Sequence, residues 1–286
     1  MLKLLPIILN LFLFFSLSSC LHSRNTESQT HYKVSKNGYC FFVENNSNEE
    51  PLDTEQEDFL KKQRKLLARS NWKSVKSTSL AYLEDHPNDK LALAHLSIAV
   101  YQLGSDKLAA YYTDLLLSLD TDNPIGLNIK GLLTIKNAKL LNDYRLAISY
   151  FSKAMKSNAN EVAAGLNLGY TYLSLGNAAK AAKIFSRISE RCENCQVAET
   201  GYAISLMRSG KAQDAMVILK ELSDQNPDNL VAKYELARYH FRVSRKNSNA
   251  NNILREVFEN SDKSNRKEVL KRAKMLWKDQ NKHNLF

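Results

Sequence analysis

The sequence predicts an all-α fold, a solenoid of stacked helix pairs followed by a C-terminal capping helix. The first observation is a pattern of glycine and alanine that returns after 34 residues. The second is that 9 glycines and 5 prolines in 286 residues are too few for the many tight turns of a β-sandwich or barrel. The third is that 44% hydrophobic and 24% charged residues form an ordinary soluble mixture, which can build a core and is unlike a disordered chain.

The repeat is clearest in the middle of the chain. Gly176 and Gly210 are 34 residues apart, and so are Ala181 and Ala215. With a small residue such as Gly169 seven positions before the glycine and a proline near the end of the unit, the spacing resembles the tetratricopeptide repeat (TPR). The resemblance implies units of two antiparallel helices, A and B, in a right-handed superhelix whose A helices line a concave groove.

Extension of this register in both directions predicts about six repeats, at 56–89, 90–123, 124–161, 162–195, 196–229 and 230–264. The third repeat carries four extra residues near Ala138–Asp143. The first and sixth repeats match poorly, as expected for end repeats that face solvent on one side. Residues 265–286 are expected to form the capping helix, with one apolar face and one basic face.

The first residues predict an export signal and a lipid anchor. Residues 1–19 begin with Lys3 and continue as a short apolar run, which is typical of a signal peptide. The run ends in Leu17-Ser18-Ser19-Cys20, which resembles the bacterial lipobox and implies lipidation of Cys20. Residue 21 is leucine and not aspartate, which favours the periplasmic face of the outer membrane if the host is Gram-negative. An ordinary cleaved signal with a chance cysteine is the alternative.

Residues 20–55 predict a lipidated polar tether, because they are rich in asparagine, serine and glutamate. One apolar island, Tyr39–Val43, interrupts the tether. We expect this island to dock on the domain or to pair as a short strand.

The sequence predicts no catalytic residue, metal site or cofactor. The six histidines are scattered without a His-x-x-x-His pair, and neither a phosphate-binding loop nor a Gly-x-Ser-x-Gly motif occurs. Cys192 and Cys195 form one Cys-x-x-Cys spacing, which an oxidising compartment can close to a structural disulfide. Free thiols are the alternative. A redox enzyme would need a thioredoxin-like βαβ context, so we do not expect an enzyme.

The predicted function is binding of protein partners, with no nucleic acid involved. The TPR resemblance implies that partner-contacting residues lie in the groove, here Tyr170, Arg208, Tyr234, Arg238, Phe241 and Arg242. Arginine forks bind carboxylates and aromatic rings give rigid contact area. The alternative is that these are generic exposed helix residues. The basic face of 265–286 is a second candidate surface, for anionic lipid or an acidic partner.

The plan of lipobox, polar tether and TPR body resembles the TadD-type lipoprotein of the tight-adherence (Tad/Flp) pilus apparatus. The resemblance implies a membrane-anchored scaffold for secretin assembly and fibril secretion, with pilus secretin or assembly components as partners. Two rival families share the plan: type IV pilotins with TPR folds, and the NlpI-type adaptor of peptidoglycan hydrolases.

Overall fold

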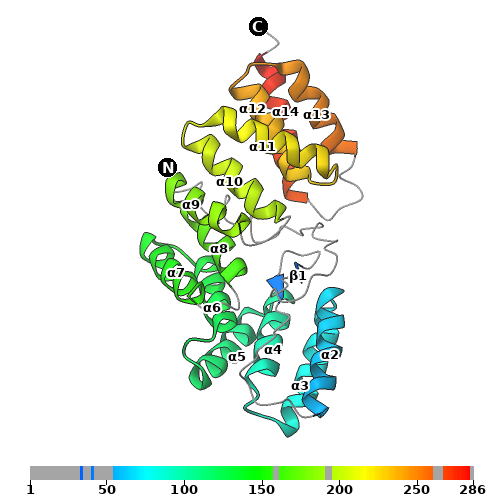
Figure 1. Cartoon of the computed structure of the whole chain (residues 1–286), viewed down its shortest axis with the longest axis vertical. Coiled ribbons are helices and arrows are strands. Elements are labelled where there is room, and N and C mark those ends of the chain that lie inside the picture. The colour runs from blue at the N-terminus through cyan, green and yellow to red at the C-terminus, as the bar shows by residue number, and fades with distance from the viewer. Residues whose placement is uncertain are drawn as a thin grey trace. The chain divides into compact units, whose positions relative to one another are not determined.

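The computed structural model describes residues 33–34, 40–41, 54–156, 161–190, 195–259 and 267–283. Within these residues it contains thirteen α-helices and one two-stranded hairpin, so the prediction of an all-α solenoid of helix pairs is confirmed (Figure 1). The signal peptide, the lipobox with Cys20, most of the tether and Cys192 lie outside the described residues. The expectations for them therefore stay predictions.

Twelve of the helices follow one another as six pairs, with an A helix followed by a B helix. The pairs are α2 (Thr54–Ala68) with α3 (Trp72–Asp85), α4 (Lys90–Gln102) with α5 (Asp106–Leu119), α6 (Pro124–Lys136) with α7 (Leu141–Ala154), α8 (Glu161–Ser174) with α9 (Ala178–Ser189), α10 (Gln196–Arg208) with α11 (Ala212–Gln225), and α12 (Leu230–Arg242) with α13 (Asn247–Glu259). One further helix, α14 (Lys267–His283), follows the last pair. It packs against α12 and α13.

The two short strands lie near the start of the described chain. Strand β1 (Lys33–Val34) pairs antiparallel with β2 (Cys40–Phe41), and Lys33 lies opposite Phe41. Two residues of the apolar island in the tether thus form a short strand, which was one of the two expectations for it.

The chain divides into two compact units at Gly169, inside α8. The described part of the N-terminal unit runs from β1 to Leu168, and that of the C-terminal unit runs from Gly169 to the end of α14. Each unit has its own buried clusters of apolar side chains.

Glycine closes three of the tight turns between A and B helices. Gly104, Gly176 and Gly210 have φ of +78°, +78° and +88°, a left-handed conformation that costs little without a Cβ. In the first and last pairs the same turn is made by Ser70, with φ of 53°, and by Arg245, with φ of 56°. These residues adopt the conformation that glycine adopts without strain, and the turn is thus one place where the two end repeats depart from the sequence pattern.

A second set of glycines lets an aromatic side chain of helix B reach the A helices. A Cβ on Gly169 would lie 2.6 Å from Cζ of Phe185, and a Cβ on Gly201 would lie 2.6 Å from its Cε1. Gly131 makes the same room for Phe151. Both phenylalanine rings are fully buried. The small residues at these positions are therefore required by packing.

The extra residues of the third repeat lengthen the connection between α6 and α7 and add a first helical turn to α7. Asp143 accepts hydrogen bonds from the backbone N–H groups of Leu140 (2.9 Å) and Lys139 (2.7 Å). These bonds hold the pKa of Asp143 below its usual value. The same insertion leaves the side chains of Leu140 and Leu141 exposed.

Candidate binding surface of the C-terminal unit

The predicted groove residues lie on three A helices of the C-terminal unit. Tyr170 is on α8, Arg208 ends α10, and the remaining four are on α12. The cap of Asn229, whose side chain accepts from the N–H of Ala232 (3.1 Å), fixes the start of α12. The structure separates these residues into aromatic rings that are mostly buried and arginines that reach the surface.

Tyr170 packs inside the unit and leaves only 8% of its surface exposed. Its hydroxyl donates a hydrogen bond to the carbonyl of Val197 (3.2 Å), and its ring meets Phe185 edge-on with centroids 4.8 Å apart. Burial raises the pKa of its hydroxyl. The structure therefore corrects the prediction for Tyr170, because its polar and aromatic groups are already used in packing.

Tyr234 and Phe241 belong largely to the core of the last helix pair. Tyr234 is 9% exposed and lies in a cluster with Leu230 and Leu254. Phe241 is partly buried and packs against the same cluster. These rings can offer an edge to a partner but not a whole face.

Arg208 connects two neighbouring A helices. Its Nη1 donates to the carbonyl oxygen of Leu173 (2.8 Å), in the last turn of α8. The same carbonyl also accepts from the backbone N–H of Gly176 (3.1 Å), so the arginine is its second donor. Burial of the guanidinium lowers the pKa of Arg208, and the positive charges of Arg238 and Arg272 lower it further.

Arg238 is held by a carboxylate that sequence reasoning missed. Its Nη2 lies 2.7 Å from Oε2 of Glu235, three residues earlier on α12. The side chain of Glu235 is only 5% exposed and that of Arg238 is 17% exposed. Nη2 also lies 3.5 Å from the sulfur of Met207 on α10. The guanidinium is thus fixed between α10 and α12.

Arg242 and Arg272 complete a group of four arginines. Arg242 is exposed and makes no hydrogen bond or ion pair with any other described residue. The charges of Arg238, Arg242 and Arg272 all act on Tyr234 and oppose the rise in its pKa, which burial causes first. We call Arg208, Arg238, Arg242 and Arg272 the arginine cluster.

Arg272 belongs to α14, for which the sequence predicts a capping helix with a separate basic face. Helix α14 packs beside α12, with Val269, Ala273 and Leu276 buried in the shared cluster. This packing brings Arg272 to the arginine cluster, while Lys271, Lys274 and Lys278 remain exposed. The spacing of apolar residues in 265–286 predicted the buried face of α14, but only the packing shows which of its basic residues joins the arginine cluster.

The Cys-x-x-Cys spacing is described only at its second cysteine. Cys195 is fully buried and is the residue that precedes α10. Cys192 lies outside the described residues, so the predicted disulfide is neither supported nor contradicted.

Two kinds of feature are absent from the described part of the chain. No group of three or more histidine, cysteine, aspartate or glutamate side chains there could hold a metal ion. None of the helices described is long and apolar enough to cross a membrane.

The N-terminal unit buries one ionisable group on an A helix. His95 on α4 is 8% exposed, and the centroids of its ring and of Phe59 on α2 are 6.2 Å apart. Burial lowers its pKa to about 4, although Asp89 opposes the shift, and Arg64 adds to it. Its Nδ1 has no hydrogen-bond partner among the described residues.

Comparison with known proteins agrees with the helix pairs. A family model for the tetratricopeptide repeat matches residues 140–195. The fold is similar to that of PilW, a widely conserved type IV pilus biogenesis factor, with 17% identity, a TM-score of 0.59, and coverage of 77% of this chain and 99% of that one. Pseudomonas aeruginosa PilF gives 19% identity, a TM-score of 0.56, and coverage of 75% and 95%.

YrrB, a TPR protein with an unusual peptide-binding site, gives 18% identity, a TM-score of 0.50, and coverage of 68% and 97%. No curated protein matches the sequence. At such low identities the likeness shows the fold alone. Together with the helix pairs and their glycine turns, it shows an all-α solenoid of TPR-like helix pairs, in which residues 140–195 match the tetratricopeptide-repeat model.

Proposed function

We propose that the protein is a membrane-anchored scaffold that binds protein partners in a pilus-type assembly apparatus of the cell envelope. The observation that carries the proposal is the surface that the A helices of the C-terminal unit present to solvent. Arg208 and Arg242 reach solvent there from A helices of successive repeats. Arginines presented on a rigid helical frame are well suited to hold a protein segment.

The membrane anchor rests on the sequence Leu17-Ser18-Ser19-Cys20. We expect the wild-type protein to incorporate labelled palmitate and to fractionate with membranes. Cys20→Ser should give an unlabelled protein that is soluble or unprocessed, because the acylated sulfur is absent. The TPR units of both proteins should give the same helical circular dichroism. Palmitate label that persists on the variant would contradict the lipid anchor at Cys20.

The pilus role rests on likeness of plan and of fold. The lipobox, tether and TPR body together resemble TadD-type lipoproteins, and PilW, whose fold is similar, is a type IV pilus biogenesis factor. We therefore propose a role in secretin assembly for a Tad/Flp-type fibre. The site is the periplasmic face of the outer membrane if the host is Gram-negative.

Deletion in the native host tests this role. We expect loss of surface fibres and of heat-resistant secretin multimers, with both restored by the wild-type gene. Chemical crosslinking in cells should link the protein to a secretin or another fibre-assembly component. Normal fibres together with crosslinks to peptidoglycan hydrolases would replace the pilus role with that of a hydrolase adaptor.

A further inference from the structure

We propose that an apolar edge of the N-terminal unit rests on a phospholipid bilayer, with its leucines at the boundary of the acyl chains and its basic neighbours among the headgroup phosphates. The apolar edge consists of the exposed large apolar side chains beside the A–B turns of the second and third helix pairs, namely Leu103, Leu108, Tyr111, Leu140, Leu141 and Leu146. The proposal rests on the membrane anchoring proposed above and adds a second membrane contact, made by the folded unit itself.

The apolar edge is one surface, because an ion pair and packing join the two helix pairs that form it. Nζ of Lys136, at the end of α6, lies 2.6 Å from Oδ1 of Asp106, at the start of α5. Further along, Leu117 of α5 and Tyr150 of α7 pack against the same buried cluster. The starts of α5 and α7 therefore lie at the same edge of the unit.

The helix pairs do not need these leucines in order to fold. Leu108 and Leu146 stand at the same position of their repeats, where the next two repeats have Lys180 and Asp214. All four side chains are exposed. Ten large apolar side chains are exposed among the described residues, and six of them gather at this edge. Single exposed leucines need no explanation, but such a gathering marks a surface that contacts something apolar.

The extra residues of the third repeat supply the most exposed leucine of the edge. Leu140 is 67% exposed and Leu141 is 48% exposed. Asp143 accepts hydrogen bonds from the N–H groups of Lys139 and Leu140, and these bonds hold both leucines at the start of α7. On the other side of this turn Tyr144 is buried. The insertion thus presents two leucines outward on a fixed frame.

Three exposed cations flank the apolar edge, Lys107 on α5 and Lys139 and Arg145 at the start of α7. None of them forms an ion pair with another described residue. The nearby carboxylate of Asp143 already accepts two backbone N–H groups. Leucine and tyrosine flanked by lysine and arginine are the combination with which protein surfaces lie at the boundary of anionic bilayers.

The size and place of the apolar edge favour a bilayer over a protein partner. A stable protein interface takes about 20–30 residues a side, and the edge with its cations has far fewer. A bilayer needs no complementary shape. The predicted anchor at Cys20 also precedes α2, so the chain leads from the membrane into the N-terminal unit first. One weak contact of this kind would orient the unit on the membrane without anchoring it.

Helix α14 is the rival membrane surface. Its exposed lysines are Lys271, Lys274 and Lys278, but Met275 is its one exposed large apolar side chain among the described residues. This face can attract phosphate but offers little to the acyl boundary, so the apolar edge fits a bilayer better.

Vesicle binding tests the proposal. The protein is residues 21–286, which keep every described helix and lack the predicted signal peptide and the lipidated cysteine. The probe is vesicles of equal parts of phosphatidylethanolamine and phosphatidylglycerol. We expect the bound fraction in co-sedimentation to rise with lipid concentration, and to be lower with phosphatidylcholine alone. Binding should weaken but persist as salt rises from about 0.05 to about 0.5 M, because salt screens the cations and leaves the apolar contact.

Two variants that lose the same kind of side chain locate the contact. Leu140→Ser combined with Leu141→Ser should weaken vesicle binding at least about tenfold, because two leucines no longer leave water. The control combines Val217→Ser with Val243→Ser, which are exposed in the C-terminal unit, and should bind as the parent does. Both variants change exposed positions and should keep the helical circular dichroism of the parent. Equal weakening by the two variants would overturn the proposal.

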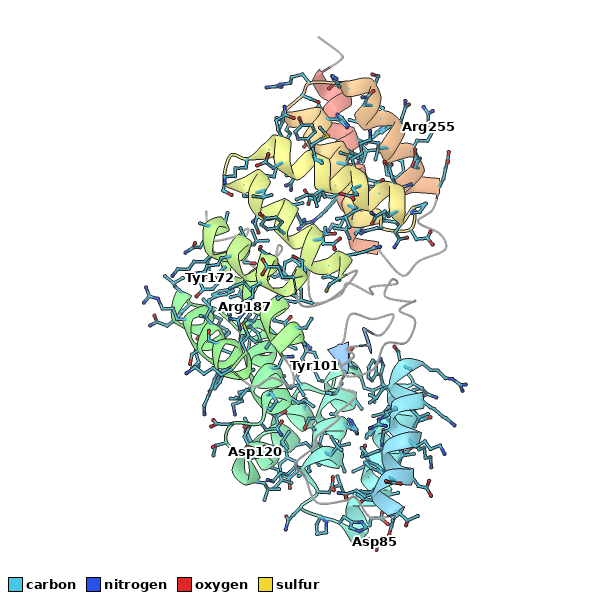
Figure 2. The ribbon with its side chains drawn as sticks, viewed as in Figure 1. Asp85, Tyr101, Asp120, Tyr172, Arg187 and Arg255 are labelled. Atoms are coloured by element: carbon cyan, nitrogen blue, oxygen red, sulfur yellow. The ribbon has the colours of Figure 1, made fainter. Side chains whose placement is uncertain are left out.

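The cations are tested in the same way, with matched changes of net charge. Lys139→Gln combined with Arg145→Gln should weaken binding at low salt. The control, Lys220→Gln on α11 with Arg255→Gln on α13, removes two exposed charges from B helices of the C-terminal unit and should weaken binding less. Arg255 projects outward from α13 in Figure 2. Equal weakening would show a general charge effect and would contradict the role of these two cations.

A tryptophan at the edge reports whether side chains enter the bilayer. Leu141→Trp should give fluorescence that shifts to shorter wavelength on vesicles and is quenched by brominated acyl chains. Val217→Trp should show neither change beyond the signal that Trp72 and Trp277 give in the parent protein. Binding without any change at Leu141→Trp would mean that the edge stays in water, which contradicts the proposal.

The remaining outcomes also decide the matter. Absence of vesicle binding would overturn the proposal, and so would binding that is lost with Lys271→Gln, Lys274→Gln and Lys278→Gln but kept in the leucine variant. A dimer in sedimentation equilibrium that the leucine variant dissolves, without vesicle binding, would assign the edge to a second copy of the chain. Because residues 21–286 carry no lipid, these results do not depend on Cys20, and persistent palmitate label on Cys20→Ser would contradict only the anchor.

Discussion

At the scale of single residues, the A helices bury polar side chains under two different conditions. Glu235 is buried beside Arg238, so its negative charge has a fixed partner. His95 is buried beside an aromatic ring, and its Nδ1 has no hydrogen-bond partner among the described residues. An opposite charge stabilises a buried charge, whereas a buried imidazole without such a partner is more stable in its neutral form. His95 therefore makes the stability of the N-terminal unit depend on pH.

We expect acid to destabilise this unit through His95. Its pKa is about 4 in the folded state, whereas an exposed histidine has a pKa of 6.5, so the unfolded chain binds more protons between these values. The contribution of neutral His95 is complete above pH 6.5 and is lost as the pH falls towards 4. The loss is at most about 3 kcal/mol. Urea unfolding at several pH values should show a flatter profile for His95→Gln than for the parent protein.

A control variant tests whether the acid sensitivity belongs to His95. His240 in the C-terminal unit also has a lowered pKa, because burial and Lys246 oppose its charge, but it is partly exposed. His240→Gln should leave most of the acid sensitivity of the N-terminal unit in place. An unchanged profile for His95→Gln would mean that other groups cause the acid sensitivity.

At the scale of helix pairs, the sequence predicted the fold because two steric requirements of the helix pair recur along the chain. The A–B turn needs a left-handed residue, as at Gly176, and the A–B crossing needs a small one, as at Gly169. Where Ser70 and Arg245 make the turn instead, the sequence signal weakens although the pair still forms. The arginine cluster was only partly predictable, because its membership depends on tertiary packing: Arg272 comes from the cap and Glu235 is buried next to Arg238.

Substitutions at the two kinds of glycine should separate the two requirements. At Gly104 a Cβ would meet nothing within 4 Å, but φ is +78°. Gly104→Ala should therefore cost about 1 kcal/mol through backbone strain alone. At Gly169 a Cβ would lie 2.6 Å from Phe185. Gly169→Ala should cost about 1–3 kcal/mol through overpacking.

Relief of the clash distinguishes these mechanisms. Phe185→Leu should restore part of the stability lost in Gly169→Ala, because the ring that collides with the new methyl group is gone. Combined with Gly104→Ala, Phe185→Leu should only lower the stability further, because it relieves no clash at Gly104. Thermal melts of the single and double variants measure both effects. Additive losses at Gly169 and Phe185 would contradict the packing assignment.

At the scale of the whole molecule, a solenoid is stabilised by contacts within repeats and between neighbours, so distant repeats need not unfold together. The chain offers a natural reporter for each compact unit. Of its two tryptophans, Trp72 begins α3 in the N-terminal unit. Trp277 on α14 packs edge-on against Phe258 in the C-terminal unit, with ring centroids 5.8 Å apart. Trp72→Phe and Trp277→Phe therefore leave a single reporter in one unit each.

We expect damage to one unit to move its own reporter first. Leu254 is fully buried in the cluster that joins α12, α13 and α14, and Leu254→Ala should cost about 2–5 kcal/mol there. In urea, the fluorescence transition of Trp277 should shift to a lower midpoint by more than that of Trp72. Leu96→Ala, fully buried in the N-terminal unit, should produce the opposite order. Equal shifts of both reporters in both variants would mean that the repeats unfold as one cooperative block, because a loss in any repeat would then be felt along the whole chain.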